Sequence, residues 1–305
     1  HSLQDMARQI QPLNTAEFIN VPANGIPADC QHITPEMLTL TQLSEAEIED
    51  IAAVIPGGMA NIQDIYPLAP LQEGVLFIHT MSEQYDPYVT SSTFEFDDDA
   101  SLASFLAALQ QLIARHDVLR TAIVWRNRTT ALQVVQREAQ LAVSQLAFND
   151  SEDVYQAFID FVAQADYWID LETAPLLQLS VCEDTVRGKH YALLSEHHLI
   201  SDHVSLEVLV EELSVLLHTP HAELAPPAPY REFVGRTLQR SGELDTAAFF
   251  SQQLGEVSEP TLPYGLSDVL NDGKAVTSVK VRLEKAQAQQ VRQLMREHNS
   301  SPAAL

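Results

Sequence analysis

From residue 62 onward, segments with helical periodicity alternate with segments of strand character, and this alternation restricts the possible folds most strongly. The segment 101–116 carries apolar residues at helical spacing, whereas 189–197 is a largely apolar run of strand length. Helices are predicted at 68–80, 101–116, 153–166, 204–218, about 230–254 and about 285–297, and strands at 89–97, 119–126, 131–137, 175–183, 189–197 and 275–283. Because strands follow one another as antiparallel-looking pairs between helices, the pattern predicts an α/β (α+β) two-layer sandwich.

The first 60 residues have a different character. Prolines at positions 12, 22, 27, 35 and 56 break regular structure, so residues 1–60 are predicted to be an interdomain linker with short helices. One such helix is expected at 43–55, where Ser44 and Glu47 have the spacing of a capping box and a Gly-Gly pair at 57–58 would end it. A second irregular stretch, ELAPPAPY at 223–230, is a candidate connection between two lobes.

Composition excludes some classes of partner. The chain has 17 basic and 42 acidic residues, a formal net charge of −25. Nucleic acids and anionic membrane surfaces are bound through Lys and Arg, so neither is expected as a partner. No apolar run approaches the roughly 18 residues that span a bilayer.

Cys30 and Cys182 are far apart and belong to no C-x-x-C pair, so we expect reduced thiols in a cytoplasmic protein, with one disulfide as the alternative.

A cluster of histidines lies where the strand 189–197 meets the helix 204–218. It reads Glu196-His197-His198-Leu199-Ile200-Ser201-Asp202-His203. Because adjacent side chains of a strand point to opposite faces, His197 and His198 cannot both face one pocket if the strand continues. One imidazole would then pack inside, while the other would project and could act as a general base near neutral pH. We take His198, His197, Asp202 and His203 as the candidate catalytic residues.

Other interpretations of this cluster stay open. Asp202 is a good N-cap residue for the helix that follows, and paired histidines at a strand end can be hydrogen-bonded structural residues. The same side chains are possible metal ligands. Their spacing differs, however, from the H-x-H-x-D-H of metallo-β-lactamases and the H-E-x-x-H of zinc proteases, so no metal is expected. His197 and Asp202 also satisfy the H-x4-D signature of glycerolipid acyltransferases, which work at membranes.

Four motifs read together carry a family resemblance. EHHLISDHVS resembles the HHxxxDG motif of condensation domains of nonribosomal peptide synthetases, and YPLAPLQEGVLF (66–77), RHDVLRTAI (115–123) and YREFV (230–234) resemble three further motifs of that family, in the same order. The resemblance spans about 62–305 and is strongest to domains that accept D-configured donors or that also epimerise. The preceding ITPEMLTLTQLSEAEIEDI looks like the usual linker from an upstream module.

The resemblance implies a chloramphenicol-acetyltransferase-like fold, with residues 61–228 as the N-terminal lobe and 229–305 as the incomplete beginning of a C-terminal lobe. Such domains join a donor acyl or peptidyl thioester to an acceptor aminoacyl thioester through an amide bond. They have no cofactor of their own. The implied partners are upstream donor and downstream acceptor carrier domains, whose phosphopantetheine arms hold the substrates, and an adjoining adenylation domain. With the second lobe truncated, the isolated fragment is expected to be inactive.

The resemblance also assigns roles to residues. It makes His198 the catalytic histidine, acting either as general base or by positioning and charge stabilisation. It makes Asp202 a structural residue in an ion pair, with Arg115 as the first candidate partner and Arg120 as the second. The glycine of the family motif is replaced here by His203.

The subfamily that also epimerises has an additional motif, HH[I/L]xxxxGD. In the equivalent stretch, 78–86, His79 and Asp86 survive, whereas Ile78 and Tyr85 depart from the motif. Dual epimerisation and condensation is therefore an alternative function. A catalytically silent module that docks carrier domains is an alternative from another class.

Overall fold

The computed structural model of the chain describes residues 20–81, 86–148, 153–165, 167–243, 245–259, 262, 265, 279 and 281–297. The chain divides into two units, residues 1–259 and 260–305. In the second unit the regular element among the described residues is helix α9 (Lys285–Glu297), which confirms the helix predicted there. The strand predicted at 275–283 is not formed at Val279 or at 281–283, and its other residues lie outside the described ones.

The described part of the first unit contains two sheets. One has the antiparallel order β1 (Ile62–Pro67), β4 (Leu132–Gln136), β3 (Thr121–Val124). The other has the order β2 (Val89–Phe96), β7 (Lys189–His197), β6 (Leu177–Asp184), β5 (Ala142–Gln145), in which only the β5–β6 pair is parallel. The predicted strands 119–126 and 131–137 pair as β3 and β4, and the predicted strands 175–183 and 189–197 pair as β6 and β7. Strands β1 and β5 were not predicted.

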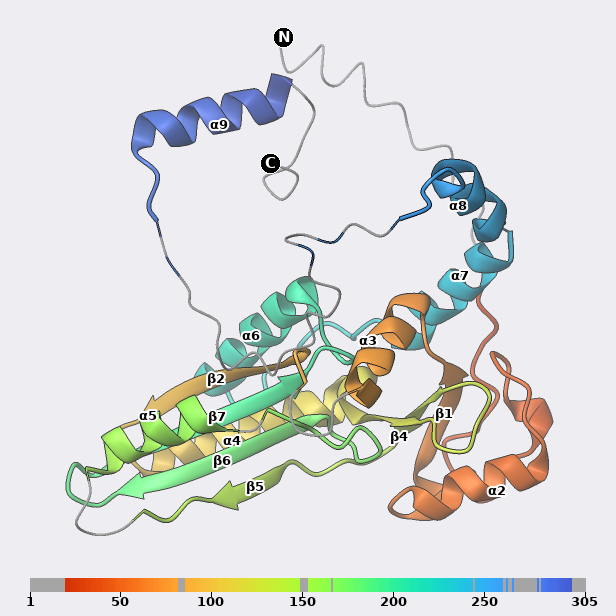
Figure 1. Ribbon diagram of the computed structural model, residues 1–305. Helices are drawn as coiled ribbons and strands as arrows, with labels where there is room; N and C mark the ends of the chain where they lie inside the picture. The colour runs from red at the N-terminus through yellow and green to blue at the C-terminus, as the bar shows by residue number, and fades with distance from the viewer. Residues whose placement is uncertain are drawn as a thin grey trace. The chain divides into compact units, whose positions relative to one another are not determined.

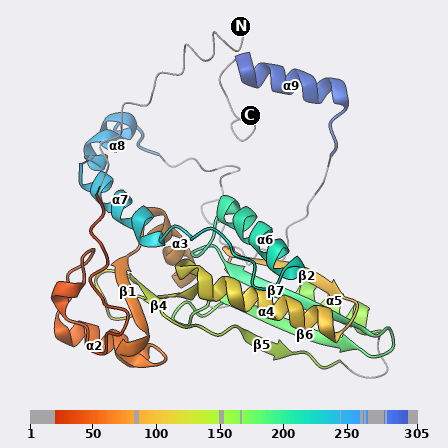
Figure 2. The ribbon, with the colours of Figure 1, turned by 180° about the vertical axis from the view of Figure 1, so that it is seen from behind.

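Helices cover both faces of the four-stranded sheet (Figures 1 and 2). On one face lies α4 (Asp99–Arg115), whose Phe105, Leu109 and Leu112 are buried in the main core. On the other face lies α5 (Val154–Gln164), where Phe158 packs against Tyr191 of β7. Because strand side chains alternate between faces, one sheet serves two cores, and the predicted α/β class is confirmed.

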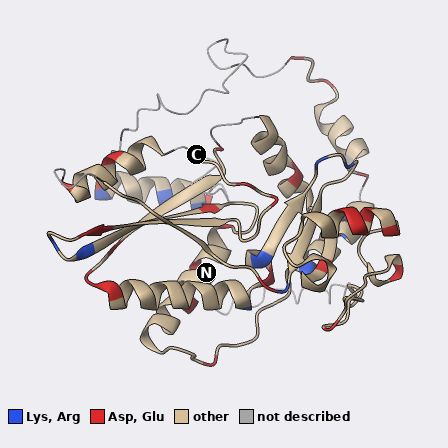
Figure 3. Cartoon of the chain, turned by 90° about the horizontal axis from the view of Figure 1, so that it is seen from below, with Lys and Arg blue, Asp and Glu red and all other residues tan. Residues whose placement is uncertain are grey.

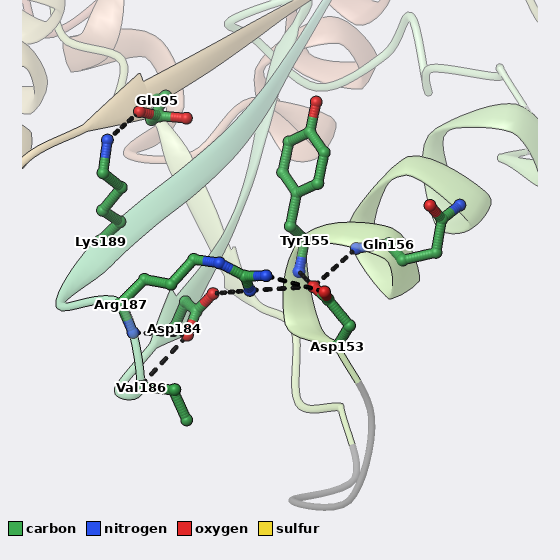
Figure 4. Close-up of polar contacts among 8 residues, drawn as sticks. All are labelled: Glu95, Asp153, Tyr155, Gln156, Asp184, Val186, Arg187 and Lys189. Atoms are coloured by element: carbon green, nitrogen blue, oxygen red, sulfur yellow. Dashed lines mark hydrogen bonds and ion pairs between the residues drawn. The ribbon is translucent and has the colours of Figure 1, made fainter.

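Ion pairs connect α5 to the β6–β7 turn and strand β7 to strand β2 (Figure 4). Asp153 is the N-cap of α5, and it pairs at 2.7 Å with Arg187 in the turn between β6 and β7. Arg187 also pairs with Asp184 at 2.8 Å, and Lys189 pairs with Glu95 across the β7–β2 edge. Asp and Glu residues are spread over helices and loops (Figure 3), in accordance with the net charge of −25.

The segment 20–55, predicted as part of a linker, packs into the main core. Ile26, Ile33, Leu38 and Ile51 are buried there, because aliphatic side chains recur through an otherwise irregular segment. The predicted helix in it is α2 (Glu45–Val54), with the expected capping box. It ends before the Gly-Gly pair, with Ile55 as its C-cap.

The described part of the first unit also contains four further α-helices and three short 3-10 helices (Pro35–Met37, Gly58–Asn61 and Asp117–Arg120). The four α-helices are α3 (Pro70–Met81), α6 (His203–His218), α7 (Tyr230–Glu243) and α8 (Thr246–Leu254). Cys30 and Cys182 are buried free thiols, as expected. Within the described ranges, every helix is too short or too polar to pass through a membrane.

Candidate functional site

The histidine pair sits where β7 ends. The backbone N–H of His197 donates to the carbonyl of Leu176 at 3.2 Å, and that of His198 donates to the carbonyl of Tyr88 at 2.9 Å. The chain then turns, with the N–H of Ile200 donating to the carbonyl of His197 at 3.1 Å. These bonds fix the backbone on both sides of the pair, so the two imidazoles keep the opposite directions that strand geometry predicts.

The imidazole of His198 is exposed and lines a pocket of about 360 Å³. The walls come from the start of α3, from the turn after β7 with the first residues of α6, and from the start of α7. The lining residues are Ala69, Leu71, Gln72, Val75, His198, Leu199, Ile200, Ser201, Asp202, Ser205, Tyr230 and Phe233. A mostly apolar cavity with a few polar groups is the usual form of a small-molecule site.

His197, in contrast, is fully buried. Its Nδ1 accepts a hydrogen bond from the backbone N–H of Leu199 at 3.1 Å, so this nitrogen carries no proton. The proton therefore lies on Nε2, which donates to Oδ2 of Asp86 at 2.9 Å. The side chain is thus a neutral imidazole in a fixed tautomer, and it supports the turn that carries His198.

Asp86 is the centre of a buried network. Its Oδ2 also accepts from Nδ1 of His79 at 2.7 Å, and its Oδ1 accepts from the backbone N–H of Tyr88 at 2.8 Å. Burial by itself would raise the pKa of Asp86, but the hydrogen bonds from His197, His79 and Tyr88 outweigh it and hold this pKa well below its usual value. His79 is stacked on Trp168, with ring centroids 5.2 Å apart.

Among the described residues, His79, Asp86 and His197 also form a group whose potential ligand atoms lie within 4.8 Å of one another. A metal ion would need the lone pair of His197 Nε2, and that nitrogen carries the proton because Nδ1 accepts from Leu199. The donor set is therefore satisfied as a hydrogen-bond network. His79 and Asp86, expected as remnants of an epimerisation motif, do not line the His198 pocket.

The predicted ion pair of Asp202 with Arg115 or Arg120 is wrong. Asp202 is the N-cap of α6, and its Oδ1 accepts from the backbone N–H of Ser205 at 2.8 Å and from the hydroxyl of Ser205 at 2.7 Å. These bonds lower the pKa of Asp202. The local capping interaction, which the sequence had left open as an alternative, satisfies the carboxylate without an arginine.

Both arginines are engaged elsewhere. Arg115, at the end of α4, pairs with Glu212 of α6 at 2.9 Å. Its position on α4 brings it beside the middle of α6 and not beside the N-terminus that Asp202 caps. Arg120 is buried, and its Nη1 donates to Oε1 of Gln63 at 2.9 Å and to the carbonyl of Gln136.

His203 is the first residue of α6, and its side chain is 85% exposed. Its Nε2 lies 3.3 Å from Oε1 of Glu207, one turn further along the helix. It does not line the pocket. Of the four candidate catalytic residues, the pocket therefore brings together His198 and Asp202.

Comparison with known proteins identifies the family. The sequence model described as "Condensation domain" matches residues 62–305. The chain belongs to the condensation-domain family. The four motifs of the sequence, with His198 among them, all fall within the matched residues.

Relatives and solved structures agree. Malpibaldin synthetase of Mortierella alpina is 38% identical over 93% of this chain, and malpinin synthetase of the same organism is 40% identical over 88%. The chain spans only 5% and 3% of those two proteins. The cyclization-docking bidomain of EpoB from Sorangium cellulosum has a TM-score of 0.55 at 18% identity, covering 78% of this chain and 49% of that one. The condensation domain of MokA, a monacolin K polyketide synthase, has a TM-score of 0.52 at 18% identity, covering 79% and 57%.

Within this condensation domain, sequence reasoning missed two residues that line the pocket, Gln72 and Tyr230, and a third, Glu196, that lies near His198. Gln72 donates to the carbonyl of Leu199 at 2.9 Å and so ties α3 to the turn after His198. Burial, with the negative charges of Asp202 and Asp117, raises the pKa of Tyr230 to about 12, so this pocket-lining phenol keeps its proton. Both residues belong to motifs that carried the family resemblance, which was the available signal.

Glu196 is the third residue that was missed, two positions before His198 in β7. Burial raises its pKa, and a positive charge on His198 acts in the opposite direction. Thr90 of the neighbouring strand β2 donates to Oε1 of Glu196 at 3.4 Å. A carboxylate thus lies within electrostatic reach of the exposed imidazole.

Proposed function

We propose that this condensation domain forms an amide bond between a donor acyl or peptidyl thioester and an acceptor aminoacyl thioester. Phosphopantetheine arms of an upstream and a downstream carrier domain would hold the substrates, beside an adjoining adenylation domain. Residues 61–228 would form the N-terminal lobe, and 229–305 would begin the second. The names of the two Mortierella relatives, both synthetases, support this setting.

One observation carries the proposal: of the two adjacent histidines, one is fully buried and the other lines a pocket. His197 is fully buried with both ring nitrogens bonded, whereas His198 is exposed at the wall of the 360 Å³ pocket. An imidazole held by a rigid strand end beside a cavity is suited to act on a reacting group in that cavity.

In the reaction, the amine nitrogen of the acceptor attacks the thioester carbon of the donor. The C–N bond forms, the C–S bond breaks, and the phosphopantetheine sulfur leaves as a thiol. The amine must lose a proton, which the imidazole of His198 accepts and then passes to the departing sulfur. Tyr230, which keeps its phenolic proton, can donate a hydrogen bond to a group in the same pocket.

Epimerisation is the weaker alternative, because His79 and Asp86 are buried and hydrogen-bonded to each other. Neither side chain lines the pocket that we propose for the substrate. A condensing enzyme without epimerase activity would leave the α-hydrogen of the donor unexchanged in deuterated water. Incorporation of deuterium at that carbon would instead support the dual epimerisation and condensation function.

The test follows product formation by the full-length natural protein with carrier domains loaded with donor and acceptor thioesters. His198→Ala is expected to lower the rate about 100-fold or more, the usual contribution of a general base. The matched control is His218→Ala, at the far end of α6, where Nδ1 lies 2.7 Å from the carbonyl of Ser214. An unchanged rate in His198→Ala would instead support a silent carrier-docking module.

A further inference from the structure

Residues 20–40, here called the arm, precede the residues matched by the family model. Apart from one 3-10 turn (Pro35–Met37) the arm is irregular, yet Val21, Ile26, Ile33 and Leu38 in it are buried. It lies beside the three-stranded sheet and beside α7 (Figures 1 and 2). A loosely attached linker would not bury its aliphatic side chains in this way.

Helix α7 packs closely against the arm at Gly235, where a larger residue would clash. A Cβ added at Gly235 would overlap the side chain of Val21, coming within 2.9 Å of its Cγ2. Glycine at this helical position therefore makes room for the arm, at a known cost in helix propensity. Leu40, at the other end of the arm, packs against the buried cluster of Tyr66, Val135 and Val234.

The guanidinium of Arg231 joins the arm to α7 and β1. Nη2 of Arg231 donates to the carbonyl of Pro22 at 2.6 Å and to Oγ1 of Thr39 at 2.8 Å, and Nη1 donates to Asp64 of β1. The hydroxyl of Thr39 in turn donates to the carbonyl of Ala23 at 3.0 Å. Arg231 is 7% exposed, so these bonds form away from water, where losing one partner is costly.

The same helix forms a wall of the His198 pocket. Tyr230, the residue before Arg231, and Phe233, two residues after it, both line that pocket. The backbone N–H of Tyr230 donates to Oδ2 of Asp117 at 3.0 Å, which fixes only the first turn. A rigid helix transmits any shift at Arg231 to both pocket residues.

We infer that Arg231 is a positioning residue of the His198 pocket: it ties the arm to β1 and thereby holds Tyr230 and Phe233 in the pocket wall. The arm is then a part of the condensing site, although none of its residues reaches the pocket. The inference deepens the proposed function and rests on it, because the pocket matters only if substrate enters there.

The test uses the full-length natural protein and measures both amide formation and hydrogen exchange in α7. Arg231→Met removes the guanidinium but keeps a long side chain. The matched control is Arg137→Met, because Arg137 holds the same arm at the carbonyl of Pro27 (2.6 Å) but lies outside α7. Arg231→Met is expected to lower kcat/KM about tenfold, mainly through a higher KM, and to speed exchange at 231–238 about tenfold. Arg137→Met should change either quantity less than about threefold.

Three further variants distinguish the proposed role from a simple folding defect. Arg231→Met leaves the carboxylate of Asp64 buried without its ion-pair partner, which could destabilise the fold. The double variant Asp64→Asn/Arg231→Met removes both charges and so avoids that cost. It should show the same loss of kcat/KM as Arg231→Met alone. Gly235→Ala should act like Arg231→Met by displacing Val21, and adding Val21→Ala should restore the rate.

Equal effects of Arg231→Met and Arg137→Met on kcat/KM and on exchange would overturn the inference, because the arm would then be a general stabiliser. If the wild-type protein forms no amide product, the proposed function fails. Exchange at 231–238 still decides the inference in that case, since it does not depend on activity.

Discussion

Oδ2 of Asp86 lies 2.9 Å from Nε2 of His197, although 111 positions separate the two residues. The bond fixes the tautomer of the first histidine of the pair and sets the turn that presents the second, His198, to the pocket. The residue that orients the site therefore comes from the segment before β2, far from the histidine motif itself.

Asp86→Asn should lower the free energy of unfolding at pH 7 by about 2–3 kcal/mol, because hydrogen bonds to a charged acceptor are replaced by weaker ones. The pKa of Asp86 is lowered on folding, so its stabilising contribution is complete above the unfolded value near 4 and is lost as the pH falls below it. The difference in the free energy of unfolding between Asp86→Asn and the wild type should therefore become smaller below pH 4. Urea unfolding followed by tryptophan fluorescence measures it, since Trp125 and Trp168 both contact His79.

The two histidines should differ sharply in their effect on stability. His197→Ala should cost about 3 kcal/mol, because it leaves Asp86 and the N–H of Leu199 without a partner in the interior. His198→Ala should stay within about 0.5 kcal/mol of the wild type, as exposed substitutions usually do. The same urea titration compares them. Equal losses would mean that His198 is also a structural residue.

Features with local signals were predictable from the sequence. The capping box of Ser44 and Glu47, the β6–β7 pair and the opposite directions of His197 and His198 each depend on residues close together in the chain. The same is true of the N-cap of α6, which the sequence offered for Asp202 beside the ion pair implied by the family resemblance. The local interaction was the correct one.

Features that depend on distant partners were missed. Strand β1 contains a buried aspartate, Asp64, which is tolerated because Arg231, 167 positions away, pairs with it. Neither residue reveals the other in the sequence. Strand β5 is a short exposed edge strand with no alternating pattern to mark it. The burial of the arm likewise depends on surfaces of α7 that its own composition does not reveal.

Substitutions at Asp202 separate a helix cap from an ion pair. Asp202→Ala should cost about 1 kcal/mol, the usual loss of an N-cap, whereas Asp202→Asn and Asp202→Ser should be nearly neutral because both cap well. A buried ion pair predicts instead that loss of charge in Asp202→Asn costs about 3–5 kcal/mol. Thermal and urea unfolding of the three variants distinguishes the two, and a large loss in Asp202→Asn would contradict the cap.

Asp64 gives the opposite pH dependence to Asp86. Burial raises its pKa to about 6, more than the attraction of Arg231 lowers it, so the folded chain holds a proton that the unfolded chain has released between about pH 4 and 6. The stability contributed by this group is therefore greatest below pH 4 and declines as the pH rises to 6. Asn at position 64 does not titrate. As the pH rises from 4 to 6, the free energy of unfolding of Asp64→Asn should therefore increase by about 2–3 kcal/mol relative to that of the wild type. Arg137→Met keeps Asp64 and should keep the wild-type slope. A difference between Asp64→Asn and the wild type that stays constant with pH would show that Asp64 is already ionised throughout.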